Sequence, residues 1–251
     1  MQNVDYTYNI RGWLKGINDT DTSNASITLG SGDLFGFQIS YNNPSTGTPL
    51  YNGNISQTFW KTANTDTGLK NYNYTYDALN RLTAATDNTS LTPNRYNESL
   101  SYDKNGNIMS LLRMGNTDAA ATIFGTMDNL VYTYDGGNKL TKVEDSSGST
   151  EGFKNGSNSP TEYAYDANGN MITDLNKGIS SITYNYLNLP TQVVMTGGTI
   201  NYVYDATGVK QQKIVNGITT DYAGGFNYEG GLMKFFSQPE GYVANNNGIF
   251  S

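Results

Sequence analysis

Short stretches of alternating apolar and polar residues, separated by turn residues, run along most of the chain. Residues 100–102 alternate with period two, and residues 103–106 then read Asp-Lys-Asn-Gly. This alternation predicts a strand with one buried face, and the Asp-x-x-Gly interruption predicts a tight turn. Only residues 29–37 and 115–129 could form short helices or turns, and neither has a convincing amphipathic period. The pattern therefore predicts an all-β chain.

One phrase recurs: Tyr-x-Tyr-Asp, two free positions, Gly or Asn, a polar or basic residue, and an aliphatic residue. Such internal repetition indicates a repeat protein, and its irregular spacing is typical of units that tolerate insertions between them. Asn80 and Asn138 replace the glycine in two of the copies. Five good copies are defined by Tyr74, Tyr76 and Asp77; Tyr102, Asp103 and Gly106; Tyr132, Tyr134 and Asp135; Tyr163, Tyr165, Asp166 and Gly169; and Tyr202, Tyr204, Asp205 and Gly208.

Further copies are degenerate. The copy that begins at Tyr6 has Asn9 in place of the aspartate. A copy read as Tyr184-Asn-Tyr186 has lost both the aspartate and the glycine, and a half-copy covers residues 51–55.

Each copy predicts a β-hairpin. The two tyrosines fall on one face of a strand, because side chains alternate there. The aspartate opens a turn, and the Gly or Asn four residues after the second tyrosine takes a positive φ, as in a type I turn closed by a G1 bulge. The fold class is therefore an antiparallel meander of hairpins, a curved and open spiral sheet that forms one domain over residues 1–251.

Successive hairpins should align their tyrosines as a ladder, which we interpret mainly as structural stacking. The exposed strand edges at the two ends predict either capping or an edge-to-edge dimer, because an open edge pairs readily with another chain.

Composition excludes several function classes. The chain has no Cys and no His, so it lacks thiolate or imidazole metal sites and the nucleophile pairs that depend on them. A net charge of −7 argues against nucleic-acid binding. No apolar run reaches the length of a membrane span, and no signal peptide is evident. We expect no enzyme activity, no metal and no cofactor.

A hydrolase is the weakest alternative, because no spacing singles out a pair of carboxylates. Calcium binding is also disfavoured, since turn chemistry explains the aspartates. The candidate carboxylates are Glu98, Asp103, Glu151 and Glu162.

The phrase Tyr-x-Tyr-Asp-x-x-Gly-Arg-Leu resembles the signature of YD repeats, also called RHS repeats. Residues 74–82 match it almost residue for residue, and the copies span residues 6–210. The resemblance implies a segment of a β-shell like those of bacterial toxin complexes, RHS toxins and teneurins. The implied partners are the rest of the shell and an enclosed C-terminal effector, in a bacterial extracellular or cell-surface setting.

The self-cleaving core of such chains has an Asp-Pro-x-Gly-Arg pattern that this sequence does not match, so we expect a fragment of a longer chain. The main alternative to a structural segment is a carbohydrate- or surface-binding module that uses aromatic faces. Its candidate ligand-binding residues are Trp13 and Trp60, the only tryptophans. Burial of both rings is the favoured interpretation, because large aromatic side chains are mostly buried.

Overall fold

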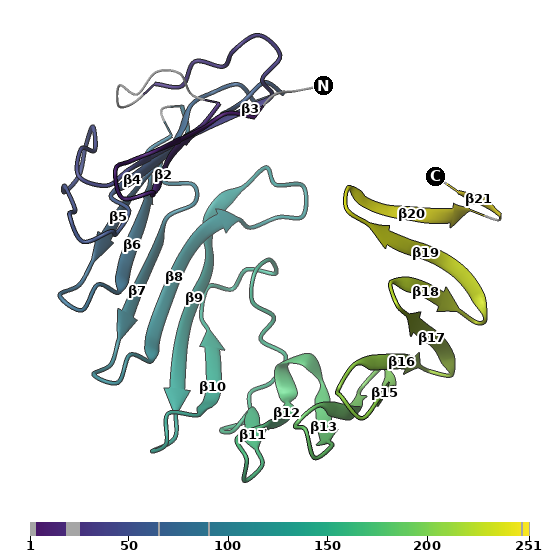
Figure 1. Cartoon of the computed structure of the whole chain (residues 1–251). Coiled ribbons are helices and arrows are strands. Elements are labelled where there is room, and N and C mark those ends of the chain that lie inside the picture. The colour runs from purple at the N-terminus through teal and green to yellow at the C-terminus, as the bar shows by residue number, and fades with distance from the viewer. Residues whose placement is uncertain (1–3, 19–25, 65, 90, 247, 251) are drawn as a thin grey trace. The chain divides into compact units, whose positions relative to one another are not determined.

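The computed structural model describes residues 4–18, 26–64, 66–89, 91–246 and 248–250. They form two antiparallel sheets in which every strand follows its predecessor in chain order, ten strands in the first and eleven in the second (Figure 1). Among the described residues, the only helical segment is a single 3-10 turn, η1, at Leu175–Lys177. The prediction of an all-β antiparallel meander is confirmed.

The first sheet contains β1 to β10. Their bounds are Tyr6–Tyr8, Leu14–Ile17, Phe35–Ser40, Gln57–Thr62, Lys70–Tyr76, Leu82–Asp87, Glu98–Tyr102, Ile108–Asn116, Phe124–Tyr134 and Leu140–Asp145. The second sheet contains β11 to β21. Their bounds are Tyr163–Tyr165, Met171–Asp174, Ile179–Tyr184, Pro190–Met195, Gly198–Tyr204, Lys210–Val215, Ile218–Ala223, Phe226–Glu229, Leu232–Gln238, Gly241–Asn246 and Ile249–Phe250.

The chain divides into two compact units. The first comprises residues 1–133 and 143–153, and the second comprises residues 134–142 and 154–251. Whether residues 1–251 act as one repeat domain remains a prediction.

The hairpin turns have the geometry that the repeat predicts. At the turn after β5, the Asp77 carboxylate oxygen Oδ1 accepts hydrogen bonds from the backbone N–H groups of Leu79 (2.8 Å) and Arg81 (3.0 Å). Asn80 has φ of 62°, a region that favours Gly or Asn. The strand register shifts between Thr75 and Tyr76, as expected for a bulge. The other good copies have a positive φ at the matching positions, Gly106, Asn138, Gly169 and Gly208.

The copy at residues 184–190 was aligned incorrectly. Tyr184, rather than Tyr186, is its second tyrosine, because the register shifts between Thr183 and Tyr184. Asn185 takes the aspartate position, where its Oδ1 accepts bonds from the N–H groups of residues 187 and 189. Asn188, with φ of 58°, takes the glycine position. The copy therefore retains the turn with asparagine at both key positions.

The two stretches predicted as short helices or turns contain turns and no helix. Residues 115–129 complete β8 and begin β9 around a turn, and residues 29–37 contain a turn followed by the start of β3.

The core of the first unit lies against β3 and β4. Phe59 is 1% exposed and Ile39 is 7% exposed. Gln57, fully buried beside them, is satisfied by hydrogen bonds to the loop residues Ser45 and Thr46. Buried polar side chains are tolerated when their hydrogen bonds are made internally, so this loop fixes one face of the sheet.

Candidate functional site

Tyrosine hydroxyls join one hairpin to the next. In three copies the second tyrosine donates to the backbone carbonyl of the aliphatic residue that follows the preceding turn. Tyr76 donates to Ile55 at 2.9 Å, Tyr102 to Leu82 at 2.7 Å, and Tyr184 to Met171 at 2.6 Å. We call this contact the hairpin joint.

A fourth hairpin joint involves a residue that sequence reasoning missed. Tyr41 donates to the carbonyl of Leu14 at 3.1 Å, and Leu14 is the aliphatic residue of the degenerate first copy. Residues 39–42 read Ile-Ser-Tyr-Asn, so Tyr41 stands at the second tyrosine position of a copy that lacks the first tyrosine and the aspartate. The only sequence signal for this joint is a tyrosine that follows a strand-like stretch.

Tyrosine rings also stack along single strands. The rings of Tyr72 and Tyr74 lie 6.1 Å apart with an interplanar angle of 17°, and those of Tyr202 and Tyr204 lie 6.3 Å apart. Burial raises the pKa of the hydroxyl in Tyr76, Tyr165 and Tyr204. These contacts leave the rings of the repeat engaged largely with neighbouring protein groups.

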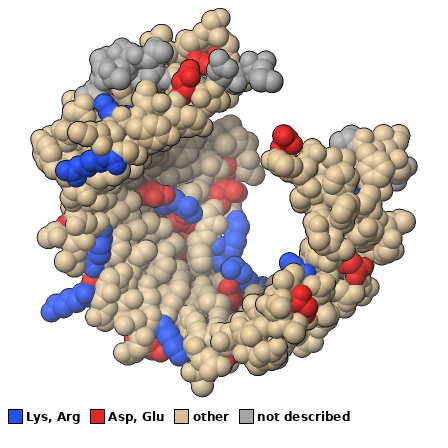
Figure 2. All heavy atoms as spheres, in the orientation of Figure 1, with Lys and Arg blue, Asp and Glu red and all other residues tan. Residues whose placement is uncertain are grey.

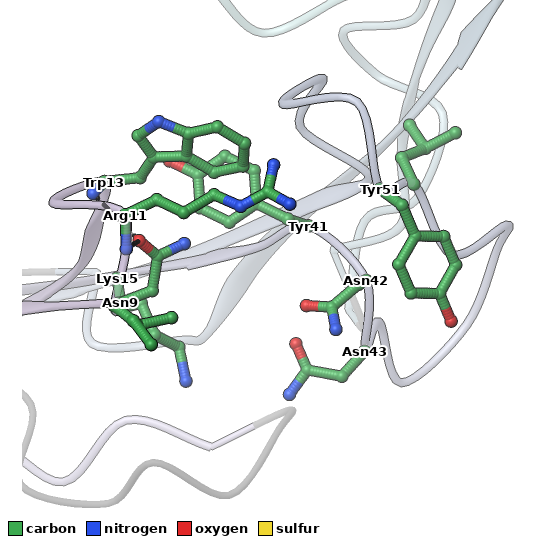
Figure 3. A pocket seen from close by; sticks show the side chains of 10 residues that line it. Asn9, Arg11, Trp13, Lys15, Tyr41, Asn42, Asn43 and Tyr51 are labelled. Atoms are coloured by element: carbon green, nitrogen blue, oxygen red, sulfur yellow. Dashed lines mark hydrogen bonds between the residues drawn. The ribbon is translucent and has the colours of Figure 1, made fainter.

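Trp13 lies in a cavity of about 400 Å³ in the first unit (Figure 3). The indole is half-buried and its centroid lies 5.2 Å from that of Tyr41. The guanidinium carbon of Arg11 lies 5.1 Å from the indole centroid, a cation–π distance. Tyr51 stands across the cavity, and its side chain is largely exposed.

Amide side chains complete this cavity. Asn42 and Asn43 lie between Trp13 and Tyr51 in Figure 3, and Asn9 lies below the indole. A site of this size with aromatic faces and a few polar groups is typical of small-molecule binding. The Oδ1 atom of Asn9 already accepts hydrogen bonds from the backbone N–H groups of Arg11 and Trp13, both at 2.9 Å.

Trp60 lies elsewhere, on β4. It is half-buried and stacks on Tyr72 with centroids 5.6 Å apart and an interplanar angle of 15°. The two tryptophans therefore line separate cavities and do not form one platform.

Charged groups are sparse. Figure 2 shows lysine, arginine, aspartate and glutamate side chains interspersed on a surface made mostly of uncharged residues. The described residues include no cluster of three or more acidic side chains that could hold a metal ion. Within the same part of the chain, no helix is long and apolar enough to cross a membrane.

The comparisons with known proteins bear on the fold. No protein-family model matches the chain, and no curated protein sequence does so. The solved structures that resemble it include TcdB2-TccC3-TEV, with 15% identity and a TM-score of 0.55, and the Photorhabdus luminescens Tc holotoxin pore with a TccC3 mutation, with 14% identity and a TM-score of 0.56. Each match covers 97% of this chain and 13% of the other.

The chain thus spans about an eighth of the length of the toxin chains that it resembles, and the likeness extends over almost all of its own length. It has the RHS-like fold of these Tc toxin components.

Proposed function

We propose that this chain is a non-catalytic wall segment of an RHS-type β-shell in a bacterial secreted or cell-surface protein related to toxins. The observation that carries the proposal is the hairpin joint, which recurs between successive hairpins at Tyr41, Tyr76, Tyr102 and Tyr184. A joint that recurs along the chain suits a sheet whose role is to be long and continuous.

The fold comparison supports the same function, since the chain matches a short stretch of much longer toxin chains. In this proposal the five good copies of the repeat are structural residues, and the partners are further repeats of the shell and an enclosed C-terminal effector. The open edges of the segment would then pair with those repeats, and an isolated segment would pair with a second copy of itself.

The test is to determine the coding sequence on both sides of codons 1–251 and to image the whole protein by cryo-electron microscopy. We expect further repeats and a hollow shell around a C-terminal segment. A whole protein without further repeats would overturn the wall function.

The Trp13 cavity favours a second candidate function, the binding of a carbohydrate. An indole face suits the apolar C–H face of a sugar ring, and the neighbouring amides suit its hydroxyls. A glycan array with the Trp13→Ala variant tests this function, and Trp60→Ala is the matched control. We expect binding by the parent chain and by Trp60→Ala, with loss in Trp13→Ala. Absence of binding by the parent chain, or equal binding by all three proteins, would remove this candidate.

A further inference from the structure

A second cavity of about 510 Å³ opens over β4 to β9 in the first unit. Its lining includes Trp60, Tyr72, Asp87 and Glu98. The strand register brings these residues together. Tyr72 lies directly opposite Asp87, and Glu98 lies directly opposite Arg113. Directly opposite residues project from the same face of a sheet. Glu98 also lies opposite Ala85, two residues before Asp87, so both pairs project from the same face.

Asp87 is the unusual member of this group. Its side chain is buried, with 1% of the residue exposed. Its Oδ1 accepts bonds from the N–H and the hydroxyl of Thr89, at 3.0 and 2.6 Å. The second oxygen, Oδ2, is buried and has no hydrogen-bond partner. A buried polar atom without a partner costs free energy, and a charged one costs more, so a donor that reached Oδ2 would remove this cost.

Three cationic side chains, Lys70, Arg95 and Arg113, also line this cavity, and each contacts another group of the chain. The Lys70 ammonium contacts the Asp66 carboxylate at 3.0 Å and the carbonyls of Asp66 and Gly68. The Arg113 guanidinium is paired with Asp128. The Arg95 guanidinium carbon lies 4.3 Å from the Phe124 ring centroid.

Aromatic side chains and carboxylates lie side by side in the remaining lining. Trp60 stacks on Tyr72, and Tyr96 accepts a 2.8 Å bond at its carbonyl from the Tyr72 hydroxyl. Asp87 and Glu98 line the cavity together with the Tyr72 ring. Burial raises the pKa of Tyr72, and the charges of these two carboxylates raise it further. Aromatic faces beside carboxylates attract an organic cation through both cation–π and charge-assisted contacts.

We propose that this cavity, which we call the Asp87 cavity, binds an alkylammonium or guanidinium group, with Asp87 as the buried acceptor and Glu98 as the second. Such a group is present in a lysine or arginine side chain of a polypeptide and in a free polyamine. The inference is independent of the wall function, because it rests only on the lining of this cavity.

The test uses the full chain with Trp13→Phe, so that Trp60 is the sole tryptophan and reports on the cavity. Its fluorescence is titrated with N-acetyl-argininamide, N-acetyl-lysinamide and spermidine. We expect a saturable change, with affinity lowered at least tenfold in Asp87→Asn and in Glu98→Gln. Stronger binding of the amino-acid amides indicates a polypeptide ligand, and stronger binding of spermidine indicates a polyamine.

Asp33→Asn is the control, because it removes one negative charge from a turn that does not line the cavity. Circular dichroism reports whether each variant is folded. If Asp87→Asn does not fold, Glu98→Gln decides the outcome. Equal binding by all folded variants, binding of N-acetyl-norleucinamide as tight as that of the cations, or a titration without saturation would overturn the proposal.

Discussion

The hydroxyl of Tyr102 donates a 2.7 Å hydrogen bond to the carbonyl of Leu82, twenty residues earlier and in the preceding hairpin. Tyr102 also lies under Arg81, whose guanidinium carbon is 4.6 Å from the ring centroid. The same tyrosine thereby contacts the two consecutive residues that follow the preceding turn.

Removal of this hydroxyl should loosen the joint between hairpins. We expect Tyr102→Phe to lower the free energy of unfolding of the first unit by about 1 kcal/mol, because one part-buried hydrogen bond is lost while the ring remains. Urea denaturation measures this change. Tyr51→Phe is the control, since Tyr51 is 72% exposed and should leave stability unchanged. An equal effect of both substitutions would argue against a role for the joint.

The glycine of the repeat should be required for its backbone conformation. Gly169 has φ of 87°, and a Cβ at this position would contact no atom within 4 Å, so any loss in Gly169→Ala comes from conformation alone. We expect a loss of about 1–2 kcal/mol in the free energy of unfolding. Gly136→Ala is the matched control, because it also has open space but no positive φ. This control should be neutral or slightly stabilising.

Acid should weaken the turns that contain aspartate. The backbone N–H groups of Lys139 and Gly137 lower the pKa of Asp135 from its ordinary value of 3.8. The backbone N–H of Arg81 is likewise the largest cause of the lowered pKa of Asp77. Because the folded pKa lies below the unfolded one, this stabilisation is present above about pH 4 and is lost as the pH falls through the folded pKa.

Urea denaturation between pH 7 and pH 2.5 measures this dependence. Asp135→Asn should reduce it, because asparagine makes the same backbone contacts without a charge, as Asn185 does in its own turn. The reverse substitution, Asn185→Asp, should increase it. A pH dependence that neither substitution changes would assign acid sensitivity to other groups.

Removal of one partner from the ion pair of Arg113 and Asp128 should lower the free energy of unfolding. The Asp128 side chain is 0% exposed, and its Oδ2 contacts the guanidinium at 2.5 Å. Arg113→Met leaves a buried carboxylate without its cation, and we expect a loss of about 3 kcal/mol in the free energy of unfolding. The double variant Arg113→Met with Asp128→Asn should recover part of this loss. A double variant less stable than Arg113→Met alone would contradict this explanation.

Local features of the fold were accessible from the sequence, because turns depend on a few consecutive residues. The positive φ at Asn80 and Gly106 follows from the repeat phrase alone. The copy around Tyr184 was misaligned for a local reason as well. Only Tyr184-Asn-Tyr186 reads as Tyr-x-Tyr, whereas the frame that the structure adopts has Ile182 in place of the first tyrosine.

The cavities were not accessible in this way. The Asp87 cavity joins residues from β4 to β9, and its composition depends on the register of each strand pair between them. A shift of one residue at any pair would turn a different set of side chains toward the cavity. Trp13 and Trp60 were singled out as rare aromatic residues, but their separation into two cavities depends on the same long-range register. Both rings are half-buried, between the two alternatives that were weighed.

The hairpin joint has a consequence for how such chains change in length. Each joint uses only a hydroxyl from one hairpin and a main-chain oxygen from the hairpin before it, and main-chain oxygens are present whatever the side chain. A duplicated hairpin would therefore arrive with its own donor and offer its own acceptor. The joint itself would therefore require no compensating side chain in the neighbours of an inserted or deleted hairpin.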